Sequence, residues 1–181
     1  ITALQSVTLA DLSEVKFSDV CVGTDQLVGA RDAAWSAIDS AVKTAAAVQC
    51  AAAVGGAGKV LDMAVSHAKD RHQFDSPIGS FQAVQHLLAN MYGDVETAWL
   101  AAYEAIAAID QGSNDTSSKI ALAKSFCNEA FTQTCLDAHQ VFGGMGYLWE
   151  TDLHFWTRKA KEIELSWGTP LSYRRALAET L

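Results

Sequence analysis

Proline is nearly absent from this chain, and its scarcity is the strongest constraint on the fold. Only Pro77 and Pro170 occur among 181 residues, so long helices can run without the kink that an internal proline imposes. Half of the residues are hydrophobic and alanine is abundant, which favours a well-packed helical domain over a disordered chain. The spacing of apolar residues predicts helices over residues 31–71, 80–110, 116–141 and 150–165, and a short helix from Pro170.

The predicted helices are joined by short connections, which is typical of an up-down bundle. We therefore predict a mainly α fold, a bundle of four to five helices with a short β remnant at its N-terminal end. Three glycines fall in the middle of the first predicted helix, at Gly55, Gly56 and Gly58. They either break that helix or let a neighbouring helix approach closely, and we favour the close approach.

The first 29 residues have a different pattern from the rest of the chain. Apolar and polar residues alternate over 6–9 and 15–22, as they do in half-buried strands. Because two strands alone do not make a stable sheet, this section is interpreted as the edge of a larger β domain. The predicted organisation is a β-domain remnant at residues 1–29 and a helical bundle domain at residues 30–181. The chain begins at Ile1, in mid-pattern, which suggests a fragment.

Charge and cysteine content narrow the classes of function. A formal net charge of −8 argues against a nucleic-acid surface and against binding to an anionic membrane, but a few local arginines are sufficient for a phosphate ligand. We expect no transmembrane span and no signal peptide. The four cysteines lack a CxxC pair and are interpreted as mostly buried free thiols in a reducing, cytoplasmic compartment.

Two glycine-containing stretches interrupt the helical pattern about one helix apart. Residues 140–147 contain Gly143, Gly144 and Gly146, and residues 166–169 contain Gly168. Such breaks expose backbone N–H groups near helix ends, where an anion can bind. The first break could also be a simple helix–helix turn. Two openings at this separation indicate a bound cofactor.

An ordered set of motifs runs along the chain. The motifs are Arg71-His72-Gln73-Phe74, Ile78, Phe81-Gln82, Ala89-Asn90-Met91, Gln140-x-x-Gly143-Gly144-x-Gly146-Tyr147 and Gly168-Thr169. This ordered set resembles the C-terminal helical domain of acyl-CoA dehydrogenases, and residues 15–20 and 27–29 are similar to the end of that family's middle β domain. The resemblance implies an FAD-dependent oxidoreductase of fatty acid or lipid metabolism. Such an enzyme oxidises an acyl-CoA thioester at its α,β positions and passes the electrons to a transfer acceptor.

The resemblance also implies roles for individual residues, in two groups. The first group would contact the FAD of a neighbouring subunit and consists of Arg71, Gln73, Phe74, Gln140, Gly143 and Gly144. The second group, Gly168 and Thr169, would lie beside the FAD of the chain's own site. Because two subunits would line one FAD, the family implies an oligomer. Arg71 could instead cap the end of the first helix, and Phe74 could be a core residue.

The chain departs from the family at the catalytic base. Most members have glutamate two residues before the threonine of the Gly-Thr pair, where this chain has Trp167. Some members carry the glutamate on the long helix instead, at the position matching Ala45. An indole and a methyl group cannot accept a proton, so we predict no catalytic base in this chain.

Two explanations of the missing base compete. In the first, which we prefer, this chain is the subunit without the base in a hetero-oligomer, since some members assemble as α2β2 complexes. In the second, the chain forms a homo-oligomer that uses a displaced carboxylate such as Glu164, Glu162 or Asp39, or has lost the reaction. Residues 1–181 alone should be inactive.

The sequence leaves two other classes of function open. One is a non-enzymatic helical oligomerisation or interaction module derived from this family. The other is a metal site at Cys135 and His139, which share one helix face, but further ligands are not evident in the sequence, so we expect no metal.

Overall fold

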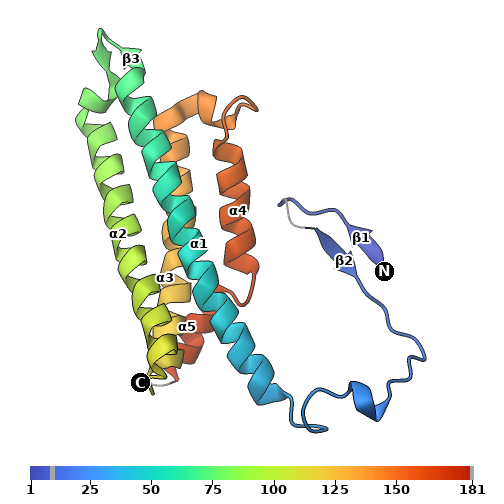
Figure 1. Ribbon diagram of the computed structural model, residues 1–181. Coiled ribbons are helices and arrows are strands. Elements are labelled where there is room, and N and C mark those ends of the chain that lie inside the picture. Colours follow the sequence, from blue (N-terminus) through green and yellow to red (C-terminus); the bar gives the residue numbers. More distant parts are fainter. Residues whose placement is uncertain (9–10, 180–181) are drawn as a thin grey trace.

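A computed structural model describes residues 1–8 and 11–179, and its main body is a bundle of helices (Figure 1). The three long helices are α1 (Trp35–Asp70), α2 (Gln82–Gln111) and α3 (Thr116–Phe142). They are followed by α4 (Leu153–Leu165) and α5 (Pro170–Ala178). Short 3-10 turns lie before α2, at η2 (Ile78–Ser80), and between α3 and α4, at η3 (Gly143–Tyr147). The predicted mainly α, up-down bundle with a short β remnant is confirmed, and the predicted helix limits differ by a few residues.

The core forms around α3, which contacts each of the other four α-helices. Most of the buried side chains on α1 and α2 are alanines, and small side chains let helix axes approach closely. Phe131 of α3 and Met91 of α2 are among the few large side chains that are fully buried. The abundance of alanine in the sequence is therefore a packing feature of this bundle.

Gly56 of α1 packs directly against the ring of Phe131 of α3. A Cβ at Gly56 would lie 2.4 Å from Cζ of Phe131, whereas a Cβ at Gly55 or Gly58 would meet nothing within 4 Å. Helix α1 continues through all three glycines for 36 residues. The predicted absence of a break is confirmed, and the close approach holds at Gly56.

We expect opposite effects from alanine at neighbouring glycines of α1. Gly56→Ala should lower the free energy of unfolding by about 1–3 kcal/mol, because Phe131 must move out of a packed core. Gly55→Ala is the matched control and should raise it by roughly 0.5–1 kcal/mol, because alanine is the better helix former. Urea unfolding of both variants measures the difference, and equal stabilities would contradict the packing of Gly56 on Phe131.

The β remnant lies beside α4 in Figure 1 and consists of one antiparallel hairpin. Its strands are β1 (Thr2–Leu4) and β2 (Leu12–Glu14), and they pair Thr2 with Glu14 and Leu4 with Leu12. The prediction of strands over 6–9 and 15–22 is wrong for residues 6–8 and 15–22, which form no strand. Leu9 lies outside the described residues. Residues 15–22 alternate as a strand does but have no strand beside them, so their backbone forms no ladder.

The prediction that no segment has the length and composition of a membrane span is wrong for helix α1. By these two measures alone α1 meets the test, and 44% of its apolar window is buried inside the protein. Its buried face packs in the bundle core. All four cysteines are free: Cys21 is exposed, and Cys50, Cys127 and Cys135 are buried.

Candidate functional site

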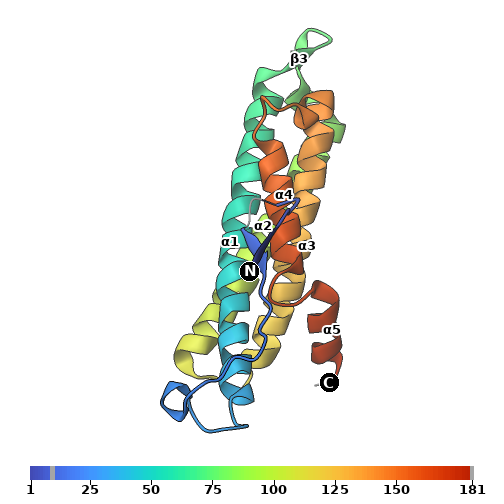
Figure 2. The same ribbon diagram turned by 90° about the vertical axis from the view of Figure 1, so that its right-hand side faces the viewer.

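The first group of predicted site residues begins on a small hairpin at one end of the bundle. Helix α1 ends at Asp70, and Arg71 follows in an extended conformation. Strands β3 (His72–Gln73) and β4 (Ser76–Pro77) then pair antiparallel, and the Ile78 amide donates a hydrogen bond of 2.8 Å to the Arg71 carbonyl. The hairpin extends the Arg71, Gln73 and Phe74 region beyond the helices (Figures 1 and 2).

The hairpin turn places an aromatic residue in a strained backbone conformation. Phe74 and Asp75 form a two-residue loop with φ angles of 55° and 60°, the left-handed region that asparagine and glycine usually occupy in such turns. Phe74 is 88% exposed, and its ring meets that of Phe81 edge-on at 6.1 Å. Strain of this kind is concentrated at functional sites, so the exposed ring fits a ligand contact better than a core position.

The second part of this group lies at the C-terminal end of α3. Gln140, Gly143 and Gly144 are exposed, and Gly143 has a φ of 60°. A Cβ at Gly143 or Gly144 would meet nothing within 4 Å, so packing does not explain either glycine, although the φ of 60° and ψ of −140° at Gly143 favour glycine there. Open backbone of this kind leaves room for a bound group to approach closely.

The C-terminal ends of α1 and α3 are in contact through a stacked pair of rings. His67 of α1 lies parallel to Phe142 of α3 with ring centroids 4.2 Å apart. Partial burial, and then the charge of Arg71, lower the pKa of His67, so the stacked ring is neutral at pH 7. This contact brings the hairpin and the Gly143–Tyr147 turn to the same end of the bundle (Figure 1).

The side chain of His139 packs against the Gly143–Tyr147 turn that follows α3. This side chain is 7% exposed, its Nε2 atom is 2.8 Å from Oγ1 of Thr157, and its ring stacks on Tyr147 at 4.5 Å. A Cβ at Gly146 would lie 2.9 Å from the other ring nitrogen of His139. Burial lowers the pKa of His139, which keeps it neutral. His139 thus shapes the turn, with Thr157 of α4 as its partner.

The second predicted group lies at the other end of α4. After Leu165 the chain turns through Trp167 and Gly168, with φ angles of 58° and 103°, before Thr169 caps the start of α5. The Thr169 Oγ1 atom accepts a hydrogen bond from the Ser172 amide, and the Tyr173 hydroxyl donates one of 2.8 Å to the Trp167 carbonyl. The indole of Trp167 remains 52% exposed.

The structure thus brings together six of the eight predicted cofactor residues and leaves two apart. Gly168 and Thr169 are separated from the others by the length of α4, 13 residues or about 20 Å. One compact ligand cannot touch both ends from within a single chain. This separation fits a chain that contributes to two different cofactors.

Comparison with known proteins gives the family. The family described as acyl-CoA dehydrogenase, C-terminal domain, matches residues 34–181. This chain belongs to the acyl-CoA dehydrogenase family.

Three relatives show how much of a family member is present. The acyl-CoA dehydrogenase IpdE2 of Mycolicibacterium smegmatis is 35% identical over 134 residues, 74% of this chain and 41% of IpdE2. The solved glutaryl-coenzyme A dehydrogenase in complex with glutaryl-CoA has a TM-score of 0.93 and 27% identity, over 98% of this chain and 45% of that one. A variant of the steroid acyl-CoA dehydrogenase Tcur3481-Tcur3483 has a TM-score of 0.76 and 26% identity, over 80% and 40%. This chain spans less than half the length of each.

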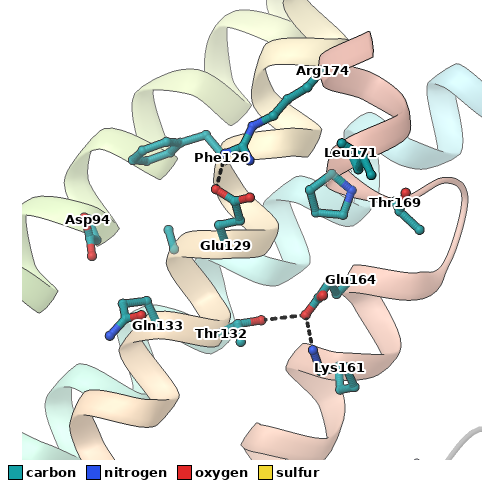
Figure 3. A pocket seen from close by; sticks show the side chains of 12 residues that line it. Asp94, Phe126, Glu129, Thr132, Gln133, Lys161, Glu164, Thr169, Leu171 and Arg174 are labelled. Atoms are coloured by element: carbon teal, nitrogen blue, oxygen red, sulfur yellow. Dashed lines mark hydrogen bonds and ion pairs between the residues drawn. The ribbon is translucent and has the colours of Figure 1, made fainter. Parts of the chain in front are cut away.

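The carboxylates that could serve as displaced bases are all engaged in ion pairs in this chain. Glu164 lies 2.6 Å from Lys161 and accepts a hydrogen bond of 3.2 Å from Thr132, on the wall of a groove of about 740 Å³ between α3, α4 and α5 (Figure 3). Glu162 lies 2.6 Å from Lys159. Both carboxylates are thus paired with a lysine three residues away on their own helix.

Asp39 completes the set, with its carboxylate 2.7 Å from Lys43. Ala45 is partly buried on the same helix, four residues before Gln49. Cys135 and His139, considered as metal ligands, both approach Thr157 instead. Among the described residues, no group of three or more His, Cys, Asp or Glu side chains is placed to hold a metal ion.

Sequence reasoning missed one buried side chain near these positions, Lys124. It lies on α3 and is fully buried, and burial lowers its pKa to about 8. A single lysine within the apolar run from Ala121 to Cys127 was the available signal, because lysine is almost never fully buried without partners.

Proposed function

We propose that this chain is part of an FAD-dependent acyl-CoA dehydrogenase, as the subunit that lacks the catalytic base in a hetero-oligomer. The observation that carries the proposal is the contrast between the two ends of the bundle. One end carries the exposed Arg71 and an exposed glycine backbone, whereas the other has Trp167 where the family has a base.

The residues of the open end suit FAD. The guanidinium of Arg71 supplies charge-assisted donors for a pyrophosphate, and Gln73 can hydrogen-bond polar edges of the cofactor. Gly143 and Gly144 leave room for the adenosine side, since a Cβ at either position would project into empty space. An FAD held by these residues would supply the acceptor for the hydride that leaves the β-carbon of the thioester.

The proton step belongs to another chain in this proposal. A carboxylate of the partner subunit removes the α-proton of the acyl-CoA, while this chain binds and orients the partner's FAD. The indole at Trp167 accepts no proton, and Glu164, Glu162 and Asp39 are held by lysines. The name of the related steroid enzyme Tcur3481-Tcur3483 joins two gene products, which is consistent with assembly from two chains.

The remaining features of the proposal follow from the family. The substrate is an acyl-CoA thioester, the electrons pass to an electron-transfer acceptor, and the complex is cytoplasmic, with α2β2 as the proposed assembly. Residues 1–181 on their own should not turn over substrate, because Gly168 and Thr169 provide only part of a cofactor site. The β-domain remnant at 1–29 and the helical domain at 30–181 form the proposed division of the chain.

Purification of the full-length chain with its partner tests the enzyme proposal against a non-enzymatic helical module. The complex should be yellow, with the visible absorbance of bound flavin, and should reduce an electron acceptor when acyl-CoA is added. A colourless complex that binds no added FAD and oxidises no acyl-CoA would establish the interaction module instead.

A further inference from the structure

Lys124 forms a buried polar contact between three helices. Its side chain is fully buried in a core made mostly of alanine and cysteine. Burying an ammonium is costly unless acceptors replace water around it. We therefore expect hydrogen-bond acceptors around the buried ammonium of Lys124.

Three acceptors surround the Lys124 ammonium, one from each of three helices. Nζ donates to Oε1 of Gln49 on α1, to Oδ1 of Asn128 on α3 at 3.4 Å, and to the Ile163 carbonyl on α4 at 2.9 Å. An ammonium carries three donors and no acceptor, so these contacts match its protonated form. All three acceptors are neutral, and the nearby groups that oppose the lowering of the Lys124 pKa are the thiols of Cys50 and Cys127.

The two partners on other helices lie close in sequence to the two base positions of the family. Gln49 follows Ala45 by four residues on α1, and Ile163 precedes Trp167 by four residues at the end of α4. One ammonium thus links α1 and α4 at residues that lie four positions from each base position in the sequence. It is the only cation that any described side-chain hydrogen bond places between these two helices.

We propose that Lys124 is a positioning residue that holds α1 and α4 at the spacing required by the chain's own flavin site. The inference rests on the proposed function, because that site is the one lined by Gly168 and Thr169. The bond to the Ile163 carbonyl holds the last turn of α4, and this turn sets where the Trp167–Thr169 segment begins. Without Lys124, α4 keeps its apolar contacts to α3 but loses its polar link to α1.

The test compares Lys124→Met with Ser125→Ala in the full-length chain purified with its partner. Methionine keeps the length and apolar character of the side chain but has no donors. Ser125 is also buried on α3, and its hydroxyl bonds only to carbonyls of its own helix, at Ala121 and Leu122. It therefore controls for loss of a buried polar group that makes no link between helices.

Two readouts distinguish positioning from a general structural role. Lys124→Met should speed amide hydrogen exchange over 163–169 by about tenfold while the 71–78 hairpin exchanges as in the wild type. It should also raise the dissociation constant of FAD at this chain's own site by about tenfold and shift the flavin visible band, the scale of one lost charge-assisted hydrogen bond. Ser125→Ala should leave both readouts unchanged.

Contrary outcomes are equally defined. Unchanged exchange over 163–169 in a folded Lys124→Met protein overturns the inference, and so does an equal effect of Ser125→Ala. If the Lys124→Met protein fails to fold, Gln49→Met provides the test instead. This variant removes only the acceptor on α1 and should speed the same amide exchange by about threefold. A wild-type complex without FAD would refute the proposed function, while the exchange readout still decides the role of Lys124.

Discussion

The Arg71→Met variant of the full-length chain should bind its partner normally but raise the dissociation constant of the partner's FAD by about 10- to 100-fold. Arg71 lies just beyond α1, at the start of the exposed hairpin and at the same end of the bundle as the open glycine turn. Its guanidinium is the cation that we assign to the cofactor pyrophosphate. Equilibrium titration of the apo complex with FAD, followed by flavin fluorescence, measures the change.

Lys69→Met is the matched control for Arg71→Met. Lys69 lies two residues earlier, in the last turn of α1, is exposed, and carries the same charge. Its removal should change FAD affinity by less than about twofold, since a solvent-exposed charge away from the ligand is strongly screened. Equal losses from both variants would assign the effect to net charge and would reject a specific contact of Arg71.

Gly144→Ala should separate cofactor binding from folding. In the free chain a Cβ at Gly144 meets nothing within 4 Å, so the free energy of unfolding should change by less than about 0.5 kcal/mol. The same methyl group would intrude on the adenosine side of the neighbour's FAD and should raise its dissociation constant by about tenfold or more. Thermal unfolding of the chain and FAD titration of the complex measure the two effects.

Gly146→Ala provides the contrast within the same turn. A Cβ there would lie 2.9 Å from a ring nitrogen of His139 and 3.1 Å from Cβ of Phe142, so it should cost about 1–3 kcal/mol of stability. If Gly144→Ala bound FAD like the wild type, the placement of the cofactor at this turn would be wrong.

Helix positions were predictable from the sequence because their signals are local. Pro170 begins α5, Gly112 ends α2 in a left-handed conformation with φ of 61°, and apolar spacing marks the stretches between. The strands predicted over 6–9 and 15–22 were wrong because alternation specifies a strand only where a partner strand completes the ladder.

The sequence predicts which residues form the candidate site but not how they are arranged. Motif spacing identified Arg71 and Gly144, and the structure adds that they share one end of the bundle while Thr169 lies at the other. Lys124 escaped notice because its partner Gln49 is 75 residues away in sequence, so only tertiary packing brings the two together. The strain at Phe74 is likewise visible only in backbone angles.

The most direct test of the central claim is anaerobic reduction of bound flavin by acyl-CoA. The full-length chain is measured first alone, reconstituted with FAD, and then together with a partner that carries glutamate at one of the two base positions. We predict that acyl-CoA bleaches the flavin only when the partner is present, because Trp167 and Ala45 leave this chain without a base. Bleaching at a comparable rate by the chain alone would contradict the account and would require a catalytic carboxylate within this chain.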